Sequence, residues 1–311
     1  MFMLLQEWCN DKVCYHYIGY LLEYGKKEDG TNFSIPYLKD ELSGLKKDDR
    51  ENKLKVFIKD SLKNIKSDQL VHSSKELTQV LFLFNIELEL RRQNSTSRFS
   101  FAEYKTIKDT IGWDQEHVAS HVDYEPKYER RVELAGDLLE YFTGIKYSNN
   151  DNYKELVQQA FPQDPKANSL CKKLLDFFNE RIEDDVLKKV YDAILTYFET
   201  EDRFKEGLRY GKKIVSEKDF IWNFVLLNSK TNRSYGNHIY PVKRQRIQRD
   251  ENVIYTPIGT RSVFEKAYSS KLTNMIAWGR NDAISYWHKI TKTLADFLPD
   301  GFTYPSYITI E

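Results

Sequence analysis

The sequence predicts a mainly α-helical protein that contains two short β-strands set far apart along the chain. Apolar residues recur at intervals of three and four over much of the 311 residues, which is the spacing of one helix face. Two compact runs, at 112–118 and 220–227, break this pattern and are typical of strands. Because these runs are the exceptions in a helical chain, they are where function is to be sought.

The first ninety residues are expected to hold four helices. Asn10 or Asp11 can cap the first, and Gly25 can end it. Two shorter helices are expected in the lysine- and aspartate-rich stretch that follows, at 37–45 and 51–65. The clearest helix begins at Ser73 or Ser74 and runs to about residue 92.

The remainder alternates between helix and short extended segments. An extended connection is expected at 94–105 and helices across 129–214. A turn-rich loop follows the second strand, and a helix is expected at 239–249, where Pro241 is tolerated in the first turn. A short strand at 254–256 and a last helix at 281–298 complete the pattern.

Composition excludes several classes of protein. Lys plus Arg and Asp plus Glu both number 47, so the formal charge is zero and the chain is no polycation. With 30% charged residues and no long apolar run, it is not expected to span a membrane, and 14% aromatics argue against intrinsic disorder. Three cysteines make neither a disulfide framework nor a zinc site. We expect a cytoplasmic protein, since no signal peptide is recognisable at the start.

The first strand carries a carboxylate next to a histidine in the sequence WDQEHVAS. In a strand, Asp114 and Glu116 point to one face and His117 to the other. A carboxylate suits a hard cation, and an imidazole suits proton transfer from water. Taken alone, such a pair is more often part of a surface ion pair.

The second strand and its loop carry asparagines and then cations. Four asparagines lie between Asn223 and Asn237, where they suit either turns or polar contacts. No acidic residue occurs from Lys230 to Arg249, which indicates a phosphate backbone as partner. The six cations of this basic segment are Lys230, Arg233, Lys243, Arg244, Arg246 and Arg249.

The order of these features resembles the HNH nuclease domain of GmrSD-type restriction endonucleases, which are bacterial anti-phage enzymes. The resemblance lies in WDQEHVAS, WNFVLLNSKTNRSYGNHIYPVKRQRI, LFNIELELRRQNSTSRFSFAEYK and IYTPIGTRSVFEKAYS, and it covers most of residues 70–298. It implies a mainly α fold, a helical domain with an embedded ββα-metal (HNH) motif that a long helical insertion splits. The third letter of that motif is Asn here rather than His.

The resemblance also implies a division of the chain. The expected parts are a 1–105 N-terminal helical region, an HNH nuclease core at 106–128 and 215–261, a 129–214 helical insertion and a 262–311 C-terminal helical segment.

The family's residue roles fall on five positions. His117 would be the general base that deprotonates the attacking water. Glu116 and Asn232 would be ligands of Mg²⁺ or Mn²⁺, and Asp114 matches a further acid beside the metal. Asn223 would hold the loop or orient the histidine.

The expected activity is metal-dependent cleavage of double-stranded DNA in restriction defence. Lys243 and Arg244 match a basic pair that touches phosphate, and Lys230, Arg233 and Arg246 complete the expected DNA-binding set. Relatives carry an upstream nucleotide-binding sensor domain with a D-G-Q-Q-R type motif, which this sequence lacks, so a sensor is expected upstream or on a partner protein. The alternative is a catalytically inactive helical module that binds DNA or protein.

Overall fold

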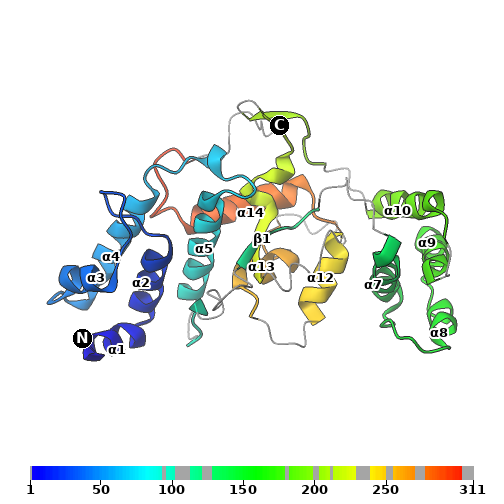
Figure 1. Ribbon diagram of the computed structural model, residues 1–311, viewed down its shortest axis with the longest axis horizontal. Coiled ribbons are helices and arrows are strands. Elements are labelled where there is room, and N and C mark those ends of the chain that lie inside the picture. Colours follow the sequence, from blue (N-terminus) through cyan, green and yellow to red (C-terminus); the bar gives the residue numbers. More distant parts are fainter. Residues whose placement is uncertain are drawn as a thin grey trace.

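The computed structural model confirms a mainly α-helical chain, whose elements Figure 1 shows in sequence order. Within the described residues the longest elements are helices, and the strands are short and paired two by two. The residues that the structure describes are 2–92, 96–101, 113–120, 128–178, 182–198, 203–210, 213–228, 239–249, 255–269 and 277–302.

Five helices make up the N-terminal part, close to the expected ranges. They are α1 (Phe2–Asn10), α2 (Lys12–Tyr24), α3 (Ile35–Leu42), α4 (Lys47–Leu62) and α5 (Lys75–Leu90). Helix α1 was not expected from the sequence.

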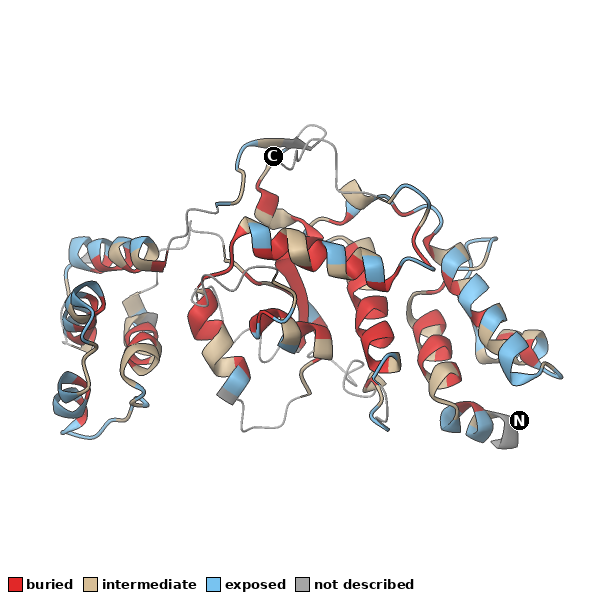
Figure 2. Ribbon diagram, turned by 180° about the vertical axis from the view of Figure 1, so that it is seen from behind, coloured by how far each residue is buried: buried red, intermediate tan, exposed pale blue. Residues whose placement is uncertain are grey.

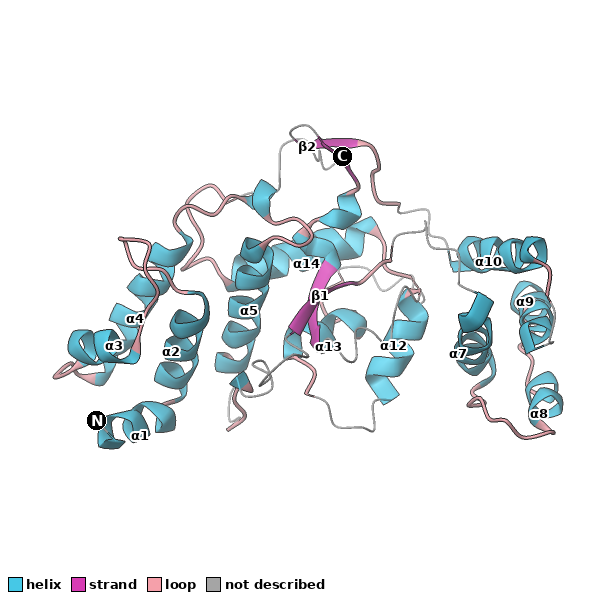
Figure 3. Ribbon diagram, in the orientation of Figure 1, coloured by secondary structure: helices cyan, strands magenta, loops and turns pink. Residues whose placement is uncertain are grey.

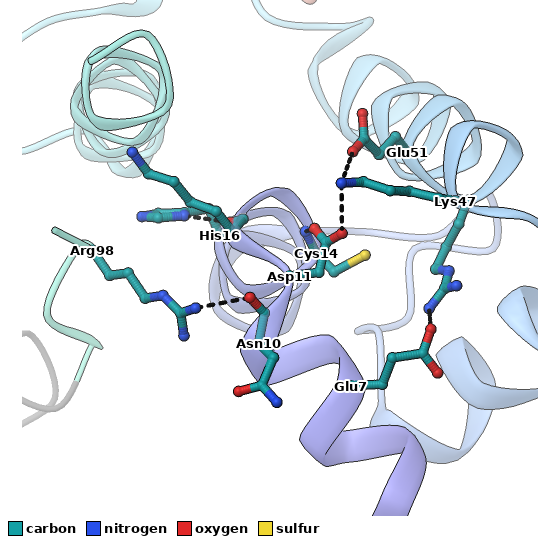
Figure 4. Close-up of polar contacts among 10 residues, drawn as sticks. Glu7, Asn10, Asp11, Cys14, His16, Lys47, Glu51 and Arg98 are labelled. Carbon is teal, nitrogen blue, oxygen red and sulfur yellow. Dashed lines mark hydrogen bonds and ion pairs between the residues drawn. The ribbon is translucent and has the colours of Figure 1, made fainter. Parts of the chain in front are cut away.

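Polar contacts fix the start of α2 and its packing on α4. The Asp11 side chain accepts a hydrogen bond from Cys14 N at 2.9 Å, as an N-cap does, and α2 ends at Gly25. Figure 4 shows the Lys47 ammonium of α4 between two carboxylates, 3.3 Å from Asp11 and 4.0 Å from Glu51. The expected cap is therefore confirmed at Asp11, and the same carboxylate also joins two helices.

Two antiparallel strands lie at the centre of the molecule. They are β1 (Trp113–His117) and β4 (Phe224–Asn228), and β4 contacts α5 and α13 (Ile258–Phe264). Helix α14 (Arg280–Thr293) packs against α5 beside them. The two predicted strands thus meet in one sheet.

A lateral group of helices occupies one end of the molecule, on the right in Figure 1. Its helices are α7 (Arg131–Thr143), α8 (Tyr153–Gln159), α9 (Pro165–Leu175) and α10 (Asp184–Phe198). They share a hydrophobic core of their own, to which α12 (Tyr240–Arg249) adds Val242. Helix α12 therefore bridges the central sheet and the lateral group.

The main hydrophobic core draws on both ends of the chain. Leu21 of α2, Phe82 of α5 and Trp287 of α14 all belong to it, together with Trp222. Figure 2 shows α5 and the sheet coloured mostly as buried, and α14 with buried residues among exposed ones. Helices of the expected 1–105 and 262–311 segments therefore share one core, while the expected division itself stays a prediction.

The structure differs from the sequence prediction at several short segments. The second strand begins at Phe224 because Ile221–Asn223 form a 3-10 turn, η5. Helix α14 ends at Thr293, and Tyr255 and Thr256 form no strand. Strands β2 (Leu208–Tyr210) and β3 (Lys213–Val215) pair antiparallel near the end of the 129–214 range, where helices are expected, and β2 is magenta in Figure 3.

Short 3-10 turns connect several of these elements. They are η1 (Ser67–Gln69), η2 (Tyr128–Arg130), η3 (Asp176–Phe178) and η4 (Glu217–Asp219), in addition to η5.

Candidate functional site

The strand pair β1–β4 brings the two predicted motifs into register. His117 lies opposite Phe224, and Glu116 opposite Val225. The rings of His117 and Phe224 are 4.2 Å apart between centroids, so the imidazole packs on the cross-strand neighbour. One further backbone bond, from Val118 N to Asn223 O at 2.8 Å, extends the pairing past the end of β1.

Asn223 fixes the turn that follows His117. Its side chain is fully buried, and its Oδ1 accepts from Ala119 N at 2.8 Å. Its Nδ2 donates to the carbonyl oxygens of Ala119 at 2.9 Å and Lys218 at 3.0 Å. Of the two roles expected for Asn223, this geometry supports holding the loop.

We expect Asn223→Asp to lower the free energy of unfolding by about 3 kcal/mol, because a buried carboxylate cannot donate to the two carbonyl oxygens and would repel them. Urea unfolding followed by circular dichroism measures the change. Asn168→Asp is the control, since Asn168 Nδ2 makes a single bond, to Pro162 O at 3.2 Å, in a partly exposed position. Equal losses in the two variants would contradict the assigned role.

Glu116 lies on the face of β1 opposite to His117, since adjacent strand residues point to opposite sides. Its carboxylate forms an ion pair with the ammonium of Lys243 on α12, and both side chains are buried. Lys243 Nζ also donates to His117 O and to Ser120 Oγ, each at 2.7 Å. Two hydrogen-bond acceptors and the paired carboxylate thus contact the ammonium.

This ion pair does not fit a Mg²⁺ site at Glu116. Burial raises the pKa of the Glu116 carboxyl, against the opposing effect of the Lys243 ammonium. A dication would have to displace an enclosed cation that already neutralises this carboxylate, and Asp114, two residues away, is exposed. The assignment of Glu116 and Asp114 as metal ligands therefore stays a prediction, and the buried ion pair of Glu116 with Lys243 argues against it.

The expected DNA-binding role of Lys243 is corrected. This lysine was expected to contact DNA phosphate, but only 1% of its surface is exposed, so it is an internal partner of the sheet. Arg244 Nε donates to Phe264 O at 3.0 Å, and Arg246 pairs with Asp137 and with Glu133 of α7. These contacts join α12 to α13 and to the lateral group, and the DNA-binding role of both arginines stays a prediction.

Three predicted site residues lie outside the described residues. They are Asn232, the expected second metal ligand, and the cations Lys230 and Arg233. The convergence of His117 and Asn232 therefore also stays a prediction.

The face of β1 that carries His117 meets two residues that the sequence did not single out. The ring of His72 lies 4.8 Å from that of His117 between centroids and stacks on Phe224 at 5.1 Å. Potential ligand atoms of His72, His117 and Asp219 all lie within 4.8 Å of one another. Two imidazoles and a carboxylate can hold a divalent cation, so this cluster is the candidate metal centre of the described residues.

Comparisons with protein-family models, with curated proteins and with solved structures give no match for the chain. Within the described residues, no helix combines the length and the apolar character needed to cross a membrane. The functional interpretation therefore rests on the site geometry and on the motif resemblance.

Proposed function

We propose that the chain is a metal-dependent endonuclease that hydrolyses phosphodiester bonds of double-stranded DNA. The observation that carries the proposal is the pairing of β1 with β4, which sets His117 against Phe224 and lets Asn223 close the following turn. Helix α12 follows β4 in the chain, and Lys243 of α12 donates to His117 O of β1, an arrangement that supports a ββα motif. Each of these contacts joins segments that the motif resemblance had grouped.

His117 is the residue on which the proposed reaction depends. Hydrolysis of a phosphodiester requires an activated water and neutralisation of phosphate charge. An imidazole can activate water by accepting its proton or by holding a cation that acidifies it. Both ways require the His117 side chain at the end of β1.

Double-stranded DNA is the proposed substrate because of the resemblance and of the basic segment 230–249, which has no acidic residue and five cations besides the buried Lys243. A role in restriction defence and a nucleotide-binding sensor, as an upstream domain or a partner, also follow from the resemblance. Such binding is sequence-independent and weakens as salt rises.

We expect purified protein to convert supercoiled plasmid to nicked or linear forms when Mg²⁺, Mn²⁺ or Zn²⁺ is present, and EDTA to reduce the rate to background. Agarose gels over a time course measure the conversion. Cleavage that continues unchanged in EDTA would contradict metal dependence. DNA binding at low salt without cleavage in any metal would favour the inactive DNA-binding module instead.

A further inference from the structure

We propose that His72, His117 and Asp219 form a binding site for one divalent transition-metal ion of the Zn²⁺ type, on the face of β1 opposite to Glu116. The inference rests on the proposed function for its catalytic meaning. Ion binding itself can be measured whether or not the chain cleaves DNA, so the two proposals can fail separately.

The three side chains converge from separate segments of the chain. His72 precedes α5, His117 ends β1, and Asp219 ends η4, yet their ligand atoms lie within 4.8 Å of one another. Ligand atoms that share one ion at about 2.1 Å lie roughly 3 to 4 Å apart. Side-chain adjustments of about 1 Å therefore suffice to surround an ion.

Backbone pairing holds the segments of His72 and Asp219 together. His72 N donates to Asp219 O at 2.7 Å, and Ile221 N donates to Leu70 O at 2.9 Å. Between these two bonds, Val71 and Phe220 form an antiparallel bridge. The relative position of the two proposed ligands is thus set by main-chain bonds before any ion binds, which is what a preorganised site requires.

Gln115 of β1 binds the segment that follows His72 and so links that segment to the strand. It lies two residues before His117, on the same face of the strand. Its Oε1 accepts from Ser73 N at 2.7 Å, and its Nε2 donates to Ser74 O at 2.7 Å. Ser73, next to His72, has a φ of 67°, an uncommon conformation for a residue other than glycine.

The carboxylate of Asp219 is oriented by the turn in which it lies. Its Oδ2 accepts from Ser216 N at 2.9 Å in a capping box. The turn is fixed to α14 because Arg280 Nε donates to the fully buried Glu217 carboxylate at 2.8 and 2.9 Å. Hydrogen bonds of this kind fix the direction of metal-binding carboxylates.

The ligand chemistry favours a transition metal over Mg²⁺. Imidazole nitrogens suit Zn²⁺ and its neighbours, whereas Mg²⁺ prefers oxygen ligands and retains its water. Two histidines and one carboxylate also match the three-ligand sets of catalytic zinc sites, which leave a coordination position for water. His72 is exposed and the other two are half-buried, so water and an ion can reach the site.

In this site His117 is a metal ligand rather than the general base expected from the sequence. As a ligand, it would act on water through the ion, which lowers the pKa of a bound water towards 7. Glu116 and Lys243 on the other face would then be structural supports of the strand.

A titration of metal-free protein with Zn²⁺ alone tests the site, with competition against a chromophoric chelator for affinity and the visible spectrum of the Co²⁺ form for ligand geometry. We expect one ion per chain, bound at least about 100-fold more tightly than Mg²⁺. His72→Gln and Asp219→Asn should each weaken Zn²⁺ binding about 100-fold or more and alter the Co²⁺ spectrum. His288→Gln is the matched control because His288 is exposed on α14, and this variant should bind Zn²⁺ as tightly as the wild type.

The outcomes separate the two proposals. Equal Zn²⁺ affinity in the wild type, His72→Gln and Asp219→Asn would overturn the inference, as would a loss seen in Asp114→Asn instead. Urea unfolding of each variant shows whether it is folded, and His72→Asn provides a second test at the exposed ligand if Asp219→Asn does not fold. Zn²⁺ bound as expected by a chain that never cleaves DNA would remove the proposed function and leave the site standing.

Discussion

Replacement of Lys243 by methionine is expected to lower the free energy of unfolding by about 3 to 5 kcal/mol. The ammonium is buried, contacts the Glu116 carboxylate and donates to two further oxygens, of His117 and Ser120. Methionine fills a similar volume but leaves a buried carboxylate without its cation. Urea unfolding at pH 7, followed by circular dichroism, measures the loss.

Two controls identify the ion pair as the cause. In the double variant Glu116→Gln/Lys243→Met no buried charge remains, so at least half of the lost stability should return. Lys53→Met removes a partly exposed ion pair with Glu41 and should cost less than about 1 kcal/mol. A loss below 1 kcal/mol in Lys243→Met would show that Lys243 is not enclosed as described.

Replacement of His117 by alanine is expected to reduce plasmid cleavage by about a thousand-fold or more, because both ways of activating water need the imidazole. DNA affinity should change less than about two-fold, since binding depends on phosphate contacts of cations. Initial rates of nicking and a filter-binding titration at fixed salt measure the two effects.

His288→Ala serves as the control for the loss of a histidine, because it removes an exposed imidazole far along the chain, on α14. Its cleavage rate should equal that of the wild type. His117→Gln keeps a polar side chain against Phe224 and shows whether lost packing accounts for the effect. A His117→Ala variant that nicks plasmid at the parental rate would remove His117 from the reaction.

Periodicity and capping chemistry were enough to predict most helices near the motif. Ser74 caps α5 through Leu77 N at 3.1 Å, and Asp11 caps α2, both at expected positions. The strand ranges also came close, because β1 and β4 are short runs bounded by polar residues. The 3-10 turn at Ile221–Asn223 was missed because apolar residues within it read as part of the strand.

Contacts between side chains that are distant in the sequence could not be predicted. Strand alternation already predicted that Glu116 and His117 face opposite ways, yet the motif grouped them at one site. The positive charge of Lys243 led to the prediction that it contacts DNA phosphate, because nothing in the sequence shows that its side chain packs against β1. His72 and Asp219 were missed because neither has a spacing relation to His117, and only the pairing of residues 70–72 with 219–221 brings them together.

In the proposed site, His117 binds one cation together with His72 and Asp219. Anomalous diffraction from crystals soaked in Zn²⁺, recorded on both sides of the zinc absorption edge, locates the ion directly. We predict one strong peak about 2.0 to 2.2 Å from a ligand atom of each of the three side chains. A peak beside Glu116, or the absence of any peak beside His117 at full Zn²⁺ occupancy elsewhere, would contradict it.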